Sequence, residues 1–295
     1  MLVFADGRTD NMYTYQSLEH VSDQIITECF NLAFSDYELP MHLTEEILRL
    51  IFTKSCVDKK YSFGAFCQDK LVGFIFNSCS VQNGEKVVFD AGTGVVPAHR
   101  GKRVFSDLFE YAWEKLKKAG YQRYYLEVLQ ENTKAISAYQ KKGFQKTREF
   151  SVLRSPTDLL NLSSEKVERV SFSDFVKLDI TKCYCPKPCY EHSMEILTAN
   201  PQLYQAMYLE QDDKVSAFCV FTPNNGNLVH VGYRDREDLK TVLEHLMSNF
   251  AGFTVKNIDR KETELLSLLA DLGFEELTRQ FEMEKEFENK TEECS

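Results

Sequence analysis

Residues 87–144 constrain the fold of this chain most, because two kinds of periodicity alternate within them. An apolar run over residues 87–96 ends at Pro97, which cannot donate a hydrogen bond within a sheet, so a strand ends there. Residues 104–119 then place apolar side chains at helical spacing, and a glycine follows them. Residues 124–129 predict a further strand and residues 132–139 a further helix, which completes a βαβα unit.

A short basic turn joins the first strand and helix of this unit, with the sequence Ala98-His99-Arg100-Gly101-Lys102-Arg103. Backbone N–H groups at the start of a helix lack carbonyl partners and carry partial positive charge, so they can bind phosphate. Gly101 would allow the backbone to approach a ligand closely. A solvated positive turn has the same composition, so the turn by itself leaves both interpretations open.

The order of motifs resembles the GNAT superfamily of acyl-CoA-dependent N-acyltransferases. The resemblance rests on VVPAHRGKRV at residues 95–104, LEVLQENTKAISAY at residues 126–139 and KKGF at residues 141–144. It implies acetyl-CoA as the acyl donor and an amine as the acceptor. It also implies that three groups of residues hold coenzyme A: the strand backbone at Gly94, Val95 and Val96, the pyrophosphate turn of Arg100, Gly101, Lys102, Arg103, Val104 and Phe105, and Asn132 beside the pantetheine arm.

The turn departs from the family pattern at two positions. The family has Arg-Gly-Lys-Gly-x-Gly or Ala, whereas Arg103 and Phe105 stand here at the two small positions. Small residues serve where backbone approaches a ligand closely. Arg103 would pair with a phosphate if it points outward, and Phe105 would narrow the pocket, so the departures bear on affinity and acyl length.

Three residues are candidates for proton transfer. The resemblance implies that Tyr139, on the second helix of the unit, protonates the departing thiolate. Asp90 and Glu127 lie inside apolar strand runs, where a carboxylate is costly to bury unless it is paired or has a task. Either would serve as the general base, directly or through water, and either would equally serve as a structural acceptor. The resemblance also makes Asp36, Tyr37 and Glu38 candidate acceptor contacts.

The element order predicts an α/β chain, with a mixed, mostly antiparallel central sheet flanked by helices and two tandem GNAT-like copies. We expect an acetyltransferase domain at residues 1–155, a polar linker near residues 161–165 and a second domain at residues 166–295. The second copy has Tyr-Arg-Asp-Arg-Glu at residues 233–237, without glycine and with acids that would repel pyrophosphate. We therefore expect this copy to be degenerate and to lack its own cofactor.

Composition narrows the function classes. A net charge of −10 disfavours nucleic-acid binding, which needs clustered Lys and Arg, and permits a cationic acceptor. Nine cysteines scattered along the chain, no secretory leader and no long apolar run predict a cytoplasmic protein that does not bind membranes. The run Cys183-Tyr-Cys-Pro-Lys-Pro-Cys189 has unusual spacing for zinc, so we expect reduced thiols and no metal.

Three functions remain compatible with these observations. The first is an N-acetyltransferase in which the amine attacks the thioester directly in a ternary complex. The second is a GNAT-like protein that binds acyl-CoA without turnover, because of Arg103 and Phe105. The third is a transferase that uses aminoacyl-tRNA, which the acidic balance argues against. The sequence does not specify the amine, and it is compatible with a monomer or an oligomer.

Overall fold

The computed structural model describes residues 12–36, 42–158 and 166–287, which form two compact units. Unit 1 runs to Tyr124 and includes the end of the chain from Glu286, and unit 2 runs from Tyr125 to Lys285. The linker expected at residues 161–165 and the tail beyond residue 288 lie outside the described residues. No helix of the described part combines the length and the apolar character needed to cross a bilayer.

Unit 1 contains an antiparallel sheet in the order β1–β2–β3–β4. Its strands are β1 (Thr14–Ser17), β2 (Phe63–Cys67), β3 (Lys70–Gln82) and β4 (Glu85–Val95). An Asn-Gly pair favours a tight hairpin turn, and Asn83 and Gly84 form one between β3 and β4, both with positive φ. In the hairpin between β2 and β3, Gln68 and Asp69 are the left-handed pair.

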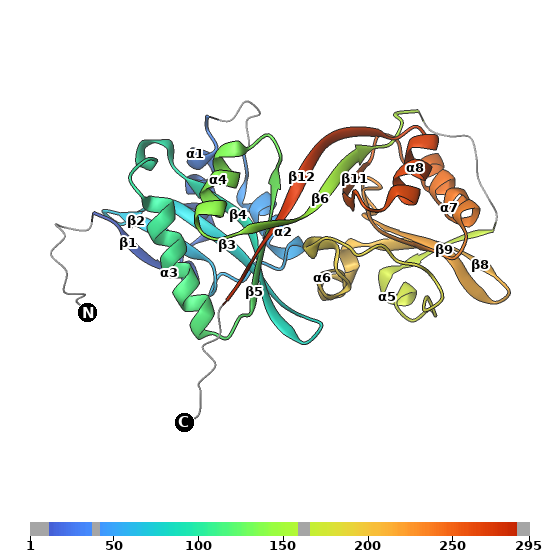
Figure 1. The fold of residues 1–295 in the computed structure, drawn as a ribbon, viewed down its shortest axis with the longest axis horizontal. Coiled ribbons are helices and arrows are strands. Elements are labelled where there is room, and N and C mark those ends of the chain that lie inside the picture. Colours follow the sequence, from blue (N-terminus) through green and yellow to red (C-terminus); the bar gives the residue numbers. More distant parts are fainter. Residues whose placement is uncertain (1–11, 37–41, 159–165, 288–295) are drawn as a thin grey trace, which may run out of the picture. The chain divides into compact units, whose positions relative to one another are not determined.

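Three helices cover the sheet of unit 1 (Figure 1). They are α1 (Asp23–Ala33), α2 (Glu45–Lys54) and α3 (Val104–Lys118). The Thr44 hydroxyl caps α2 by accepting from the backbone N–H of Ile47. Side chains alternate between the two faces of β3, so Phe74 and Phe76 pack in one core cluster with α1 and α2. Helix α3 crosses the other face.

Unit 2 contains a larger mixed sheet in the order β5–β12–β6–β11–β10–β9–β8–β7. The strands are β5 (Arg123–Leu129), β6 (Gln145–Arg154), β7 (Val167–Ser171), β8 (Gln205–Gln211), β9 (Lys214–Phe221), β10 (Leu228–Tyr233), β11 (Thr254–Asp259) and β12 (Glu275–Glu286). The helices are α4 (Thr133–Lys141), α5 (Phe172–Phe175), α6 (Met194–Ala199), α7 (Arg236–Asn249) and α8 (Thr263–Asp271).

Two apolar layers enclose the sheet of the second half. Leucines of α7 and α8 form one core cluster with alternate residues of β8, β9 and β10. The intervening residues of β8 and β9 pack with Phe172 and Phe175 of α5 and with Leu197 of α6. The two helix pairs accordingly lie on opposite faces of these strands (Figure 1).

The order of elements in the second half repeats that of the first: strand, two helices, three strands, helix, strand, helix and strand. This order confirms the predicted fold class of two tandem copies. The closing strands are exchanged between the halves, however. Strand β6 closes the first half but pairs with β11, and β12 closes the second half but lies between β5 and β6.

The end of the chain contributes to the core of unit 1, which generates a stability prediction. Phe287 is buried, stacks on Trp113 at 3.8 Å between ring centroids and donates its backbone N–H to the carbonyl of Gln122. We expect Phe287→Ala to lower the free energy of unfolding by about 3–5 kcal/mol, because a buried aromatic ring is lost. Chemical denaturation of the full chain measures this. Leu277→Ala, at an exposed site of β12, is the control and should change stability by less than about 1 kcal/mol.

Candidate functional site

The basic turn of unit 1 has a defined left-handed geometry. A short 3₁₀ helix, Pro97–His99, follows β4, and Gly101 and Arg103 both have positive φ, of 71° and 64°. Arg103 is the N-cap of α3 but provides no capping side-chain hydrogen bond. A Cβ atom at Gly101 would have no heavy atom within 4 Å. The start of α3 therefore has space in front of Gly101, as an anion site requires.

The side chain of Arg100 is engaged within unit 1. Its guanidinium donates to both carboxylate oxygens of Asp36, at 2.6 and 3.0 Å. It also donates to the backbone carbonyls of Ala33 and Val95. Arg100 thereby ties the end of α1 to the end of β4, and Asp36 offsets its charge. Tyr37 and Glu38, the other expected acceptor contacts, lie outside the described residues.

The two residues that depart from the family pattern differ in exposure. Arg103 is exposed, and its guanidinium lies 3.5 Å from the Asp107 carboxylate one turn along α3. Its left-handed backbone explains why small residues suit this position: such a conformation costs a residue with a Cβ about 1 kcal/mol or more. Phe105 is half-buried and packs at 6.0 Å from the ring of Phe109.

The carboxylate of Asp90 stabilises an irregularity in β4. Its Oδ1 accepts from the backbone N–H of Gly92 at 3.0 Å, and its Oδ2 accepts from the hydroxyl of Thr93 at 2.7 Å. The pairing register with β3 shifts at this point. Both oxygens of Asp90 therefore have structural hydrogen bonds that hold a bulge.

The strand backbone expected to meet the pantetheine arm lies just beyond this bulge. Gly94 is tightly enclosed, since a Cβ there would lie 2.7 Å from the ring of Phe74 and 3.1 Å from Ala33. The carbonyl of Val95 accepts from Arg100, and the N–H of Val96 donates to Val72. Glycine at position 94 is thus needed for packing, whatever ligand the strand binds.

In unit 2, helix α4 begins after Asn132 and carries Tyr139. The Asn132 side-chain oxygen caps this helix by accepting from the backbone N–H of Ala135 at 3.1 Å. Tyr139 lies two turns later, is buried, and packs edge-on against Phe144 at 5.5 Å. Asn132 therefore fixes the start of the helix that carries the phenol.

The carboxyl group of Glu127 lies in a buried polar cluster with residues of the second half. Its Oε2 accepts from the Asn257 amide at 2.5 Å, and its Oε1 is buried without a hydrogen-bond partner. The pKa of Glu127 is raised to about 8: burial is the largest cause, and the charges of Glu191 and Glu282 act in the same direction. The Cys189 thiol and the charge of Arg148 lower the pKa of Glu127, but by less than the other causes raise it. A carboxyl with this pKa can exchange a proton near neutral pH.

Residues 183–189 form a strap across the second half. Tyr184 pairs with Tyr233 at the end of β10 through two backbone hydrogen bonds, and its hydroxyl donates to Glu262. Arg148 donates to the carbonyls of Lys187 and Pro188. No group of three or more His, Cys, Asp or Glu side chains in the described part of the chain is arranged to hold a metal ion.

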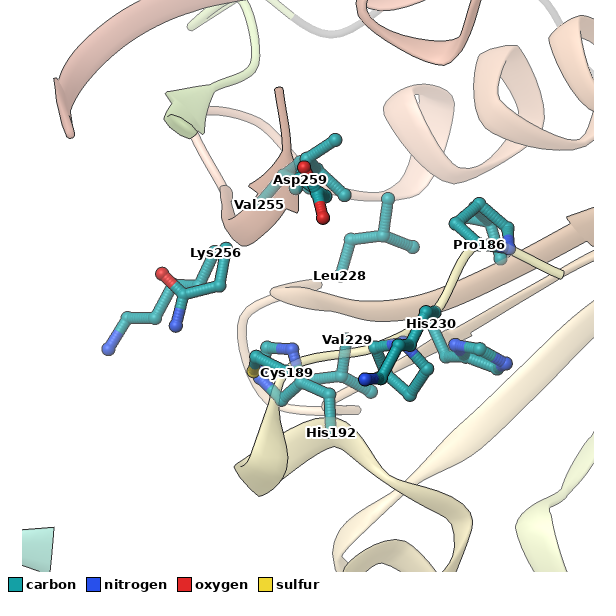
Figure 2. A pocket seen from close by; sticks show the side chains of 14 residues that line it. Pro186, Cys189, His192, Leu228, Val229, His230, Val255, Lys256 and Asp259 are labelled. Atoms are coloured by element: carbon teal, nitrogen blue, oxygen red, sulfur yellow. The ribbon is translucent and has the colours of Figure 1, made fainter. Parts of the chain in front are cut away.

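The strap closes the space between β10 and β11. These parallel strands share only the Leu228–Val255 pair, and a small cavity lies beyond it. Figure 2 shows Cys189 and His192 from the strap side of this cavity, with Leu228 and Val229 from β10 and Val255 and Asp259 from β11. The cavity volume of about 20 Å³ suffices for about one water molecule.

A family model described as acetyltransferase (GNAT) family matches residues 24–144. The match covers this segment of the first half only, so the likeness to the GNAT family is assigned to residues 24–144. A search of curated proteins gave no match.

Solved structures with the same fold extend over nearly the whole chain. A candidate acetyltransferase from Pyrococcus horikoshii is 14% identical, with a TM-score of 0.69 over 97% of this chain and 93% of that one. A GCN5-related N-acetyltransferase from Sphaerobacter thermophilus is 14% identical, with a TM-score of 0.64 over 95% and 97%. A tandem GNAT protein from the clavulanic acid biosynthesis pathway is 12% identical, with a TM-score of 0.60 over 93% and 98%.

Sequence reasoning missed the residues of the second half that surround Glu127. Asn257, Cys189 and Arg148 carry no GNAT motif, and each lies more than 20 positions from Glu127 in the chain. Asn257 gave no clear signal, because it lies in the strand run Phe-Thr-Val-Lys-Asn-Ile of residues 253–258, where Thr254 and Lys256 are also polar.

The left-handed conformation of Arg103 gives the next prediction. We expect Arg103→Gly to raise the free energy of unfolding by up to about 1 kcal/mol, since glycine adopts positive φ without a Cβ clash. Lys102→Gly is the matched control, because Lys102 does not have positive φ and glycine there should be neutral or destabilising. Denaturant melts of both variants measure the difference. A loss of stability in Arg103→Gly would contradict the strain assigned to this turn.

The raised pKa of Glu127 predicts a pH-dependent stability. Because the folded-state pKa of about 8 exceeds the unfolded value near 4.5, the contribution is complete below pH 4.5 and is lost as the pH rises towards 8. Each unit of pKa difference corresponds to about 1.4 kcal/mol. Glu127→Gln cannot ionise, so its stability relative to the unmodified chain should increase between pH 5 and 8. A constant difference across that range would show that Glu127 has an ordinary pKa.

Proposed function

We propose that this chain is an acyl-CoA-dependent N-acetyltransferase that moves the acetyl group of acetyl-CoA to a primary amine. The observation that supports this most is the buried carboxyl of Glu127, which lies inside the segment matched by the GNAT family model and has a pKa suited to proton transfer. The similar folds of the structures from Sphaerobacter and from the clavulanic acid pathway agree with it.

Donor binding would depend mainly on backbone groups. The first N–H groups of an α-helix point out of its start, and at α3 Gly101 leaves space in front of that start. We propose that residues Arg100 to Phe105 hold the pyrophosphate there, with Lys102 supplying charge and Arg100 positioning the turn through Asp36. The backbone of residues 94–96 and the side chain of Asn132 would contact the pantetheine arm.

Two residues would move protons. The amine attacks the thioester carbonyl as a neutral nucleophile, and Glu127 accepts the proton that the nitrogen loses. We assign this role to Glu127 rather than to Asp90, because both oxygens of Asp90 hold the bulge in β4. Tyr139 would then donate its phenolic proton to the departing thiolate.

The second half, residues 166–295, would have a supporting role without a cofactor of its own. The space between β10 and β11 contains the strap, and only about one water molecule fits in what remains. No pantetheine arm could enter such a volume. We propose that residues 1–155 contain the acetyl-CoA site and that the second half contributes the residues that surround the Glu127 carboxyl.

A second function is favoured by the turn itself. Arg100 is neutralised by Asp36, and Arg103 and Phe105 replace the small residues of the GNAT pattern. A protein that binds acyl-CoA weakly, or binds it without turnover, would have the same features. Measuring binding and turnover separately distinguishes the two functions.

The test of the proposed function combines calorimetric titration with acetyl-CoA and an assay of thiol release against a panel of primary amines. We expect binding in the unmodified chain, and a decrease in turnover of about 10²–10⁴-fold in Tyr139→Phe with binding unchanged, because only the proton donor is lost. Tyr184→Phe, at an exposed position, is the matched control.

Each outcome of this test has a distinct meaning. Binding without turnover against any amine would favour the acyl-CoA-binding alternative. Full activity in Tyr139→Phe would exclude the phenol as the acid. Absence of acetyl-CoA binding would overturn both functions.

A further inference from the structure

Two of the buried polar atoms that lack a partner belong to a single residue pair. The Glu127 Oε2 accepts from the Asn257 Nδ2 at 2.5 Å. The remaining oxygen of each side chain, Oε1 of Glu127 and Oδ1 of Asn257, is buried and has no hydrogen-bond partner. Asn257 as a whole is only 6% exposed and also lines the cavity beside the strap. Two of the four such atoms in the described residues thus belong to one pair of hydrogen-bonded side chains.

Protonation of the carboxyl would satisfy both atoms at once. A buried acceptor without a donor costs about 1–3 kcal/mol, and an ionised Glu127 would leave two such acceptors on neighbouring groups. A protonated carboxyl has one O–H donor and one acceptor, and a primary amide has the complementary pair. With the proton on Oε1, the two side chains can form a ring of two hydrogen bonds.

We propose that Asn257 is a positioning residue for Glu127, which pairs with its protonated carboxyl by donating to Oε2 and accepting from Oε1–H. The pairing itself needs no substrate, but its catalytic meaning rests on the proposed function of Glu127 as the base. There, Glu127 acts in its ionised form: the N–H bond of the amine breaks as the Oε1–H bond forms, and the carboxyl becomes protonated. Asn257 Oδ1 then receives that O–H, which stabilises the protonated product of the step.

The backbone around Asn257 supports a specific role. Its φ is 61°, in the left-handed region that asparagine tolerates better than most residues. The register of β11 against β6 shifts between Val255 and Ile258, so Asn257 lies in a bulge. Bulges redirect a side chain out of the regular alternation of a strand. This bulge directs the amide to the carboxyl of β5.

The charged groups around the pair favour one proton on it. Glu191 before α6 and Glu282 on β12 disfavour a negative charge on Glu127, and Arg148 on β6 favours that charge less strongly. Glu282 is itself paired with Arg148, at 2.5 Å. The Cys189 thiol of the strap also faces the pair and is the competing hydrogen-bond donor.

Infrared difference spectroscopy of the full-length chain between pH 6 and pH 10 tests this pairing without any acceptor. At pH 6 most carboxyls are ionised, so the carbonyl band of a protonated acid should come from Glu127 and disappear in Glu127→Gln. In Asn257→Gly we expect this band to move to higher wavenumber, because the partner amide is lost. Glycine suits the positive φ of position 257, so the variant should fold.

Three further variants complete the test. Asn83→Gly replaces an exposed asparagine that also has positive φ, and it should leave the band unmoved. Asn257→Asp should increase the affinity of Glu127 for its proton at least tenfold, because two neighbouring carboxyls would then share one proton. A band that stays in place in Asn257→Gly, or that moves only in Cys189→Ala, overturns the proposal. If the infrared band moves as expected in these variants but the unmodified chain transfers no acetyl group, the proposed function is overturned and the pairing stands.

Discussion

The exchange of closing strands is the constraint on which the rest of unit 2 depends. Because β12 lies between β5 and β6, and β6 in turn pairs with β11, strands from both halves of the sequence form one sheet. That arrangement places Glu127 of β5 against Asn257 of β11 and near Glu282 of β12. The polar cluster therefore exists only when both halves are folded together, and neither half could bury the Glu127 carboxyl in this way alone.

The buried ion pair between Arg148 and Glu282 links this sheet to the strap. Their side chains are only 10% and 6% exposed, and Arg148 also donates to two carbonyls of the strap. A buried pair contributes little net stability, since desolvation offsets the attraction, but breaking one partner leaves an uncompensated charge. The Arg148–Glu282 pair instead fixes geometry. The guanidinium of Arg148 holds the backbone of residues 187 and 188 in place, and the strap in turn places the Cys189 thiol beside the Glu127 carboxyl.

Local sequence patterns predicted the helices and strands well, but they did not predict which distant strands pair with each other. The Thr44 cap and the Asn83-Gly84 turn have signals a few residues long in the sequence, and the predicted order of elements, built from such signals, is confirmed. The pairing of β5 with β12 has no local signal, because an exposed sheet edge accepts any strand of suitable register. The hydrogen bond from Arg100 to Asp36 could not be predicted either, because the sequence of a basic turn is the same whether its side chains contact a ligand or a neighbouring helix.

The two copies of the turn before a helix differ in a way that bears on the roles proposed for them. At α7, the Asp235 carboxylate accepts from the backbone N–H groups of Glu237 and Asp238, so the helix supplies its own anion. At α3, Arg103 makes no capping hydrogen bond, and Gly101 leaves the approach open. A helix whose first donors are already capped by a carboxylate would repel a phosphate, whereas one without a cap gains from binding one. This contrast supports placing the donor in the first copy, and it follows from one aspartate and one glycine.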